Sequence, residues 1–253
     1  MTEVEDVWLF DLGNTRLKSA RLDANGQIRQ LSAQVHAMRD GGIRELALPE
    51  GTVAHLASVA GEAVSIALLD RLSRRFGRIQ IVRTQGRFAG LRVAYAEPAT
   101  LGVDRFLAML GAREREPGAV LVAAVGTALT IDLIAADGAH LGGRIAPSPD
   151  LMREALHARA RQLPGRGGEY REFADATENA LASGCEGAGL ALIERSLAVA
   201  SERLGRPPAL LLHGGGADGL LRMLPQARHA PMLVLEGMAL WSRAGSRRAA
   251  ASA

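Results

Sequence analysis

The stretch Asp11-Leu12-Gly13-Asn14-Thr15-Arg16-Leu17-Lys18 ends an apolar run that begins at Val7. This pattern predicts a buried strand that delivers an acid to a tight turn, followed by a returning strand. We expect Gly13 to let the backbone turn and present N–H groups to an anion, with side-chain donors from the two residues after it. Lys18 lies on the returning strand, where it can reach a phosphate, and Asp11 is placed to position Mg²⁺, directly or through water. A hairpin turn with a solvated aspartate is the structural alternative.

A second copy of this pattern makes the structural alternative weaker. The run from Val120 to Ala128 repeats it 113 residues later, with Gly126 in the place of Gly13 and Thr127 in the place of Asn14. In each copy the sequence predicts strand, glycine turn, strand, hairpin turn and strand. We interpret this as an internal duplication.

The seam of the duplication is predicted at Glu116-Pro117-Gly118, which divides the chain into domains 1–117 and 118–253. Elsewhere strands and helices alternate, so the predicted class is α/β. Helices are expected at about 102–115, 177–204 and 217–224. Strands are expected at 209–212 and 232–235.

Composition excludes several classes of protein. The 253 residues are 48% hydrophobic and 23% charged, with net charge +3, which excludes a disordered chain. Cys185 is the only cysteine, so intramolecular disulfides and cysteine-rich zinc sites are excluded. No apolar run reaches the roughly 18 residues of a membrane span, and no secretory signal is visible, so we expect a cytoplasmic protein. No nucleic-acid partner is expected, although the pI is near 9.7. Lys18 is the only lysine among 30 basic residues, which points to a need for a compact ammonium there.

A second candidate site is the run Gly102-Val103-Asp104-Arg105 at the start of a predicted helix. The helix dipole alone explains an acid in the first turn, but it disfavours the adjacent cation. A carboxylate base beside a guanidinium that holds a substrate anion explains both residues. Packing alone would explain Tyr95, and an N-cap role alone would explain Thr177. His140, His157 and His213 lack metal-ligand spacing, so structural roles are expected for them.

The run Gly214-Gly215-Gly216-Ala217-Asp218-Gly219 matches the dinucleotide fingerprint GxGxxG after a predicted strand. Glu236, about 20 residues later at the end of the next predicted strand, would be the ribose acid. Only 17 residues follow Glu236, too few for a mononucleotide-binding half. A glycine turn that holds adenosine in another fold needs fewer assumptions.

Together these motifs resemble type III pantothenate kinase, of the superfamily that holds acetate kinase, the sugar kinases, actin and the heat-shock chaperone ATPases. The resemblance covers nearly the whole chain. It rests on DLGNTRLK (11–18), LGVDR (101–105), GTALTIDL (126–133), GAHLGGRIAP (138–147), Leu163-Pro164, Thr177, Gly214-Gly215 and VLEG (234–237).

The resemblance implies ATP-dependent phosphorylation of pantothenate to 4'-phosphopantothenate, the first step of coenzyme A biosynthesis. It implies two duplicated RNase H-like, actin-like ATPase domains around a nucleotide cleft, and a homodimer with the pantothenate site near the subunit interface. By this resemblance Asp11 to Lys18 and Thr127 bind ATP, and Asp11 positions Mg²⁺. Tyr95, Gly102, Val103, Asp104, Arg105 and Thr177 line the pantothenate site. Asp104 is the general base.

Two positions depart from the family's pattern. The second phosphate loop usually begins with an aspartate linked to a monovalent cation, and here that position is Ala124. A methyl group cannot bind K⁺ or NH₄⁺, so no cation site is assigned. Either the protein lacks this cation site, or backbone oxygens and another acid replace the aspartate, or activity is reduced. The residue before Gly214, often threonine in the family, is His213.

Three other functions stay open on the sequence. Ala124 favours a non-catalytic accessory or regulatory protein on the same fold, and intact Asp104 and Lys18 oppose it. The GVDR run opposes another kinase of the superfamily. An NAD-binding protein is disfavoured, because too few residues follow Glu236 to form the second half of a dinucleotide-binding sheet.

Overall fold

A computed structural model describes residues 5–36 and 40–251, which form two compact units. The first unit holds the chain up to Arg115 together with the segment from Met232, and the second is Glu116–Pro231. The division after Arg115 lies close to the predicted seam. The expected domain 118–253 differs from the second unit, because its last segment belongs to the first.

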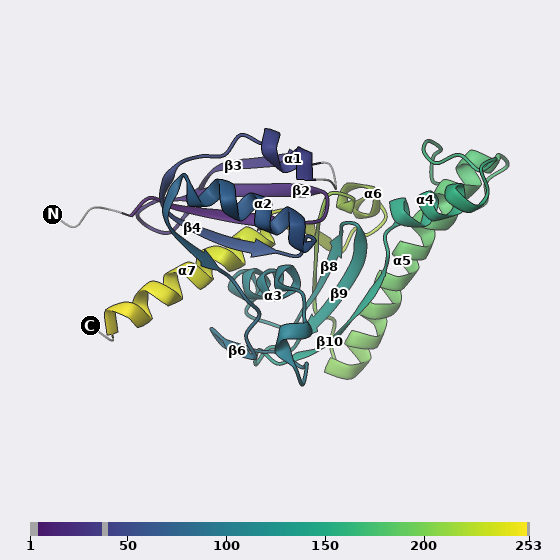
Figure 1. Cartoon of the computed structure of the whole chain (residues 1–253). Coiled ribbons are helices and arrows are strands. Elements are labelled where there is room, and N and C mark those ends of the chain that lie inside the picture. Colours follow the sequence, from purple (N-terminus) through teal and green to yellow (C-terminus); the bar gives the residue numbers. More distant parts are fainter. Residues whose placement is uncertain (1–4, 37–39, 252–253) are drawn as a thin grey trace. The chain divides into compact units, whose positions relative to one another are not determined.

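The first unit is built on a five-stranded sheet in the order β3-β2-β1-β4-β5 (Figure 1). β1 pairs antiparallel with β2 and parallel with β4. The strands are β1 (Val7–Leu12), β2 (Arg16–Leu22), β3 (Ile28–Val35), β4 (Gly51–Ser58) and β5 (Phe76–Ile81), with a small pair β6 (Arg87–Phe88) and β7 (Leu91–Arg92). The helices are α1 (Asp40–Glu45), α2 (Glu62–Ser73), α3 (Val103–Arg115) and α7 (Leu233–Ala251), with the 3₁₀ turn η1 (Pro98–Thr100).

The second unit repeats this topology, with a sheet in the order β10-β9-β8-β11-β12. β8 pairs antiparallel with β9 and parallel with β11, as β1 does with β2 and β4. Its strands are β8 (Val120–Val125), β9 (Ala128–Ile134), β10 (His140–Pro147), β11 (Ala209–His213) and β12 (Ala227–His229). Its helices are α4 (Pro149–Arg159), α5 (Thr177–Leu204) and α6 (Ala217–Leu221). The predicted α/β class and internal duplication are therefore confirmed.

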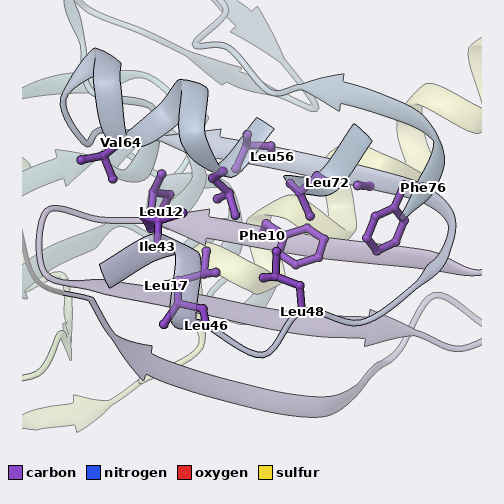
Figure 2. Close-up of a cluster of buried hydrophobic side chains, with 12 residues drawn as sticks. Phe10, Leu12, Leu17, Ile43, Leu46, Leu48, Leu56, Val64, Leu72 and Phe76 are labelled. Atoms are coloured by element: carbon purple, nitrogen blue, oxygen red, sulfur yellow. The ribbon is translucent and has the colours of Figure 1, made fainter. Parts of the chain in front are cut away.

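Alternating side chains of β1 divide the first unit into two layers. Phe10 and Leu12 join a buried cluster with residues of α1 and α2, among them Ile43 and Leu72 (Figure 2). Leu9 and Asp11, of the opposite parity, lie on the other face of the sheet. α7 covers that face, since its Ser242 is 3.1 Å from the ring nitrogen Nε2 of His55 on β4. Burial of Phe10 and Leu12 thus fixes the register of β1, and with it the position of Asp11 on the face opposite to their cluster.

Helices α3 and α7 cross at two glycines. A Cβ on Gly111 would collide with the carbonyl oxygen of Leu233, and a Cβ on Gly237 would collide with that of Leu107. Arg115 pairs with Glu236. The predicted strand at 232–235 is therefore wrong, because this short apolar run begins a helix that packs on α3; periodicity does not separate a buried helix turn from a strand.

The other predicted elements were closer to the structure. The helix expected at 177–204 and the strand at 209–212 are confirmed as α5 and β11. The helix expected at 217–224 ends at Leu221, and β12 was not predicted. Across residues 5–36 and 40–251, no helix has the length and hydropathy that spanning a bilayer requires.

Candidate functional site

The first loop connects β1 to β2 through Gly13, Asn14 and Thr15. Lys18 lies on the returning strand, as the sequence predicts, and there it is directly paired with Asp11. The backbone N–H of Gly13 donates to the carbonyl of Arg16 at 3.0 Å, which closes the hairpin. The strands therefore place one carboxylate and the only lysine of the chain side by side at the base of the loop.

Side-chain burial divides the stretch 11–18 into two groups. Leu12 and Leu17 lie in the hydrophobic cluster, so they can offer a ligand only their backbone. Asn14, Thr15 and Arg16 are exposed. At the tip of the loop, the side chains of these three residues lie outside the hydrophobic core.

Gly13 is not needed for the turn, contrary to the expectation from sequence. Its φ is not positive, and a Cβ there would meet only the Arg16 carbonyl oxygen, at an ordinary 3.5 Å. Gly126 in the second unit is similar, with its nearest neighbour the Ala128 carbonyl oxygen at 3.8 Å. The fold tolerates a side chain at both loops. Glycine at both positions is therefore better explained by close approach of a ligand to the backbone.

Asp11 is a buried acid with a strongly shifted pKa. Burial raises the pKa of its carboxyl from 3.8 to about 6, the charge of Lys18 opposes this rise, and the charge of Asp104 adds to it. Asp11 and Asp104 therefore lie close enough for each to sense the other's charge. The chain brings together two acids that sequence reasoning chose from separate motifs.

Asp104 stands in the first turn of α3, where its Oδ1 accepts a hydrogen bond from the backbone N–H of Arg105 at 2.8 Å. A Cβ on Gly102 would lie 2.6 Å from that same oxygen, so a side chain there would displace the Asp104 carboxylate. The Arg105 side chain is 7% exposed, and its Nη1 donates to the hydroxyl of Tyr95 at 3.1 Å. Val103 packs into the core. The structure therefore places Tyr95 and the residues of the GVDR run in one neighbourhood.

The remaining predicted site residues belong to the second unit. Thr127 is exposed in the turn between β8 and β9, and Ala124 is half-buried on β8. Thr177 is the exposed first residue of α5, and the N-cap is Ala176. The capping alternative for Thr177 is therefore wrong.

The glycine turn after β11 is explained by packing. Gly214 has φ +100°, and a Cβ there would lie 2.8 Å from the backbone nitrogen of Val125. A Cβ on Gly216 would lie 2.9 Å from the Val125 side chain. The rival dinucleotide interpretation also loses its ribose acid, because Glu236 lies in α7 and pairs with Arg115.

The donors for a metal are few. Within the described part of the chain, no three His, Cys, Asp or Glu residues gather into a cluster. His140 pairs with Asp132 at 3.0 Å, and His157 contacts the Leu163 carbonyl at 2.6 Å, so both make structural contacts. Asp11, next to Asp104, remains the carboxylate best placed for a divalent cation.

His36 is a site residue that sequence reasoning missed. It is 2% exposed, and its ring nitrogen Nε2 lies 2.9 Å from the carbonyl oxygen of Gly13. Its backbone N–H donates to the carbonyl of Thr15 at 3.0 Å. No motif contains it; only the antiparallel pairing of β2 and β3 brings it to the loop.

Comparison with known proteins shows the family of the chain. The family model described as type III pantothenate kinase matches residues 7–198. Proteins of that name from Xanthomonas axonopodis pv. citri and Xanthomonas campestris pv. campestris are each 54% identical to this chain. The matches cover 94% and 93% of this chain, and 98% and 96% of the relatives.

Solved structures agree on the fold. A 2-dehydro-3-deoxygalactonokinase protein from Sinorhizobium meliloti has TM-score 0.60 at 15% identity, over 94% of this chain and 98% of that one. A Baf family transcriptional activator from Campylobacter jejuni has TM-score 0.58 at 20% identity, over 91% and 94%.

Proposed function

The chain belongs to the type III pantothenate kinase family, and from this premise we propose how its residues transfer a phosphoryl group from ATP to pantothenate. The reaction yields 4'-phosphopantothenate and ADP, as the first step of coenzyme A biosynthesis. The observation that carries the proposal is the position of Asp11, which is paired with Lys18 on the neighbouring strand and senses the charge of Asp104 from a separate motif.

Asp104 is the general base. It is half-buried at the start of α3, and its carboxylate is oriented by the backbone N–H of Arg105. In this role it accepts the proton of the pantothenate hydroxyl as the oxygen attacks the γ-phosphorus. Glycine at 102 leaves room for the carboxylate, which a side chain there would displace.

Arg105 and Tyr95 hold the acceptor. The Arg105 guanidinium can pair with the carboxylate of pantothenate, and the hydrogen bond that its Nη1 donates to the Tyr95 hydroxyl helps to orient it. Thr177, exposed at the start of α5, adds a hydroxyl to the acceptor site.

The loop Gly13–Thr15, Lys18 and Thr127 bind the phosphates of ATP. A Cβ would fit at Gly13 and at Gly126 without a clash, so phosphate oxygens have room to approach the backbone there. Lys18 offers a compact positive charge beside the loop.

Mg²⁺ fits Asp11. Burial and the charge of Asp104 both disfavour the ionised carboxylate, and a divalent cation would offset both effects. Mg²⁺ is commonly held by one or two carboxylates together with substrate phosphates, which needs no larger cluster of acids. When bound, the ion would neutralise charge on the phosphates.

We also propose a cytoplasmic homodimer. Exposed apolar side chains, Leu151 and Leu156 among them, border a groove of about 650 Å³ between α4 and α5 of the second unit. Phe173 is 100% exposed. Such a surface suits a second copy of the chain. Sedimentation should give a dimer at micromolar concentration, and Leu156→Glu should give a monomer.

The accessory-protein alternative is not favoured, because relatives at 54% identity are named as kinases. The direct test is a coupled ADP-release assay with ATP, Mg²⁺ and pantothenate, with product identified by ³¹P NMR. ADP release that depends on pantothenate, with a new phosphate monoester, supports the proposal. A folded protein with no pantothenate-dependent turnover would contradict it.

A further inference from the structure

His36 holds both ends of the first loop. Its ring nitrogen Nε2 contacts the Gly13 carbonyl at 2.9 Å, and its own backbone N–H bonds the Thr15 carbonyl at 3.0 Å. A carbonyl oxygen only accepts, so Nε2 must carry the hydrogen and donate it. This holds for neutral and for protonated imidazole, so the contact persists in both charge states.

The contact with the ring fixes the orientation of one peptide plane. In a planar trans peptide, the carbonyl of residue 13 and the N–H of residue 14 point to opposite sides. When His36 holds the Gly13 carbonyl, the N–H of Asn14 is directed away from the buried ring. Glycine has a wide range of backbone conformations, so without such a contact this peptide is the one most free to reorient.

We infer that His36 is a positioning residue for nucleotide binding. It orients the backbone N–H of Asn14 toward a phosphate of ATP without touching the nucleotide. This inference rests on the proposed function. Backbone donors that are fixed before the ligand arrives bind a phosphate more tightly than donors that must first reorient. An imidazole with 2% exposure also costs more to bury than an apolar side chain, so its polar contacts explain its presence better than filling space does.

Two variants separate the hydrogen bond from the packing. In His36→Gln the side-chain amide carries its donor about as far from the backbone as Nε2, whereas His36→Met has similar length and no donor. The readouts are the affinity for AMPPNP with Mg²⁺ by calorimetry and the separate KM values for ATP and pantothenate. His55→Met, which also removes a buried imidazole of the first unit, is the control.

We expect His36→Met to weaken AMPPNP binding and raise KM for ATP by about tenfold, with KM for pantothenate unchanged. His36→Gln should stay within about threefold of the unaltered protein. His55→Met should lower stability without altering affinity for AMPPNP. If the methionine variant fails to fold, His36→Asn, whose amide is too short to reach Gly13, replaces it.

Equal AMPPNP affinity in all variants would overturn the inference, and so would equal losses in His36→Met and His36→Gln. Absence of AMPPNP binding by the unaltered protein would overturn it together with the proposed function. If AMPPNP binding follows the expected order but pantothenate is not phosphorylated, only the proposed acceptor fails and the role of His36 stands.

Discussion

Ala124 and His213 are paired residues on the neighbouring parallel strands β8 and β11. They are also the two positions at which the second loop region departs from the pattern of the type III pantothenate kinases. Paired residues on adjacent strands place their side chains on the same face of the sheet. A buried imidazole therefore stands beside the position where the family's pattern has a carboxylate.

This pair predicts turnover that does not depend on K⁺. Hard cations prefer oxygen ligands, and neither a methyl group nor an imidazole supplies one. Replacing K⁺ by Na⁺ at constant ionic strength should change kcat by less than about twofold. Ala124→Asp restores the missing carboxylate and is the variant in which a response to K⁺ can appear. Strong activation of the unaltered protein by K⁺ would refute this prediction.

Asp104→Asn should reduce kcat by about 10²-fold or more, because the amide keeps the shape of the side chain but cannot accept the proton. Steady-state ADP release with saturating pantothenate and ATP measures the effect. Glu62→Gln is the matched control, since Glu62 is also an acid in the first turn of a helix. Both variants weaken the interaction with a helix dipole, but only Asp104→Asn should lose turnover. Near-normal kcat in Asp104→Asn would remove its role as base.

The topology could be predicted from the sequence because the duplication is visible in short sequence patterns. Apolar runs, glycine turns and returning strands recur at Val7 and at Val120, and the two sheets have the same order. The C-terminal segment was predicted wrongly because its state depends on a distant partner. The apolar run at 232–235 becomes helical where Gly111 and Gly237 let α3 and α7 touch.

The proximity of candidate site residues was predictable where they are close in sequence: Asp11 and Lys18 are paired on adjacent strands, and Asp104 and Arg105 share the first turn of α3. His36 was not predictable, because it contacts the loop through strand pairing about 20 residues away in sequence. The role of Gly13 was misjudged for a similar reason. The sequence shows a glycine in a turn, but only the structure shows that its φ is not positive and that a Cβ would fit there.

Gly13→Ala should separate folding from nucleotide binding. Because the backbone at Gly13 suits any residue, the free energy of unfolding should stay constant or rise by up to about 1 kcal/mol. KM for ATP should rise by about tenfold or more, since the methyl group occupies the space proposed for phosphate. Urea unfolding and steady-state kinetics measure the two effects.

Gly214→Ala should behave in the opposite way and is the comparison for Gly13→Ala. Its φ of +100° and the nearby Val125 backbone make alanine strained, at a cost of about 2 kcal/mol or more. Loss of stability in Gly13→Ala similar to that in Gly214→Ala would mean that Gly13 serves the fold.

His55 should make the protein less stable in acid. Burial, with a smaller contribution from the charge of Arg78, lowers the pKa of its imidazole from 6.5 to about 4. Between these values the unfolded chain binds a proton that the folded chain excludes, so stability falls as pH decreases from about 6.5 to 4. Urea titrations at pH 7 and pH 4.5 should show this loss, and His55→Gln should make it smaller. An unchanged pH dependence in His55→Gln would contradict the assignment.

The effect of Asp11 on stability has the opposite pH dependence to that of His55. Asp11→Asn should therefore raise the stability of the protein and lower its activity. The pKa of Asp11 is raised from 3.8 to about 6, so between these values the folded chain keeps a proton that the unfolded chain has lost. The contribution of Asp11 to stability therefore falls as pH rises through this window, and the charged carboxylate destabilises the metal-free protein at pH 7.5. Asp11→Asn should then be more stable than the unaltered protein by about 1–3 kcal/mol at pH 7.5, with little difference near pH 4. Its turnover with Mg²⁺ should fall sharply.

Asp23 is the control, because hydrogen bonds from the backbone N–H groups of Gln27 and Asn25 lower its pKa. Asp23→Asn should destabilise the protein at pH 7.5 and leave turnover intact. If Asp11→Asn were the less stable protein at pH 7.5, the carboxylate would be serving the fold rather than the site.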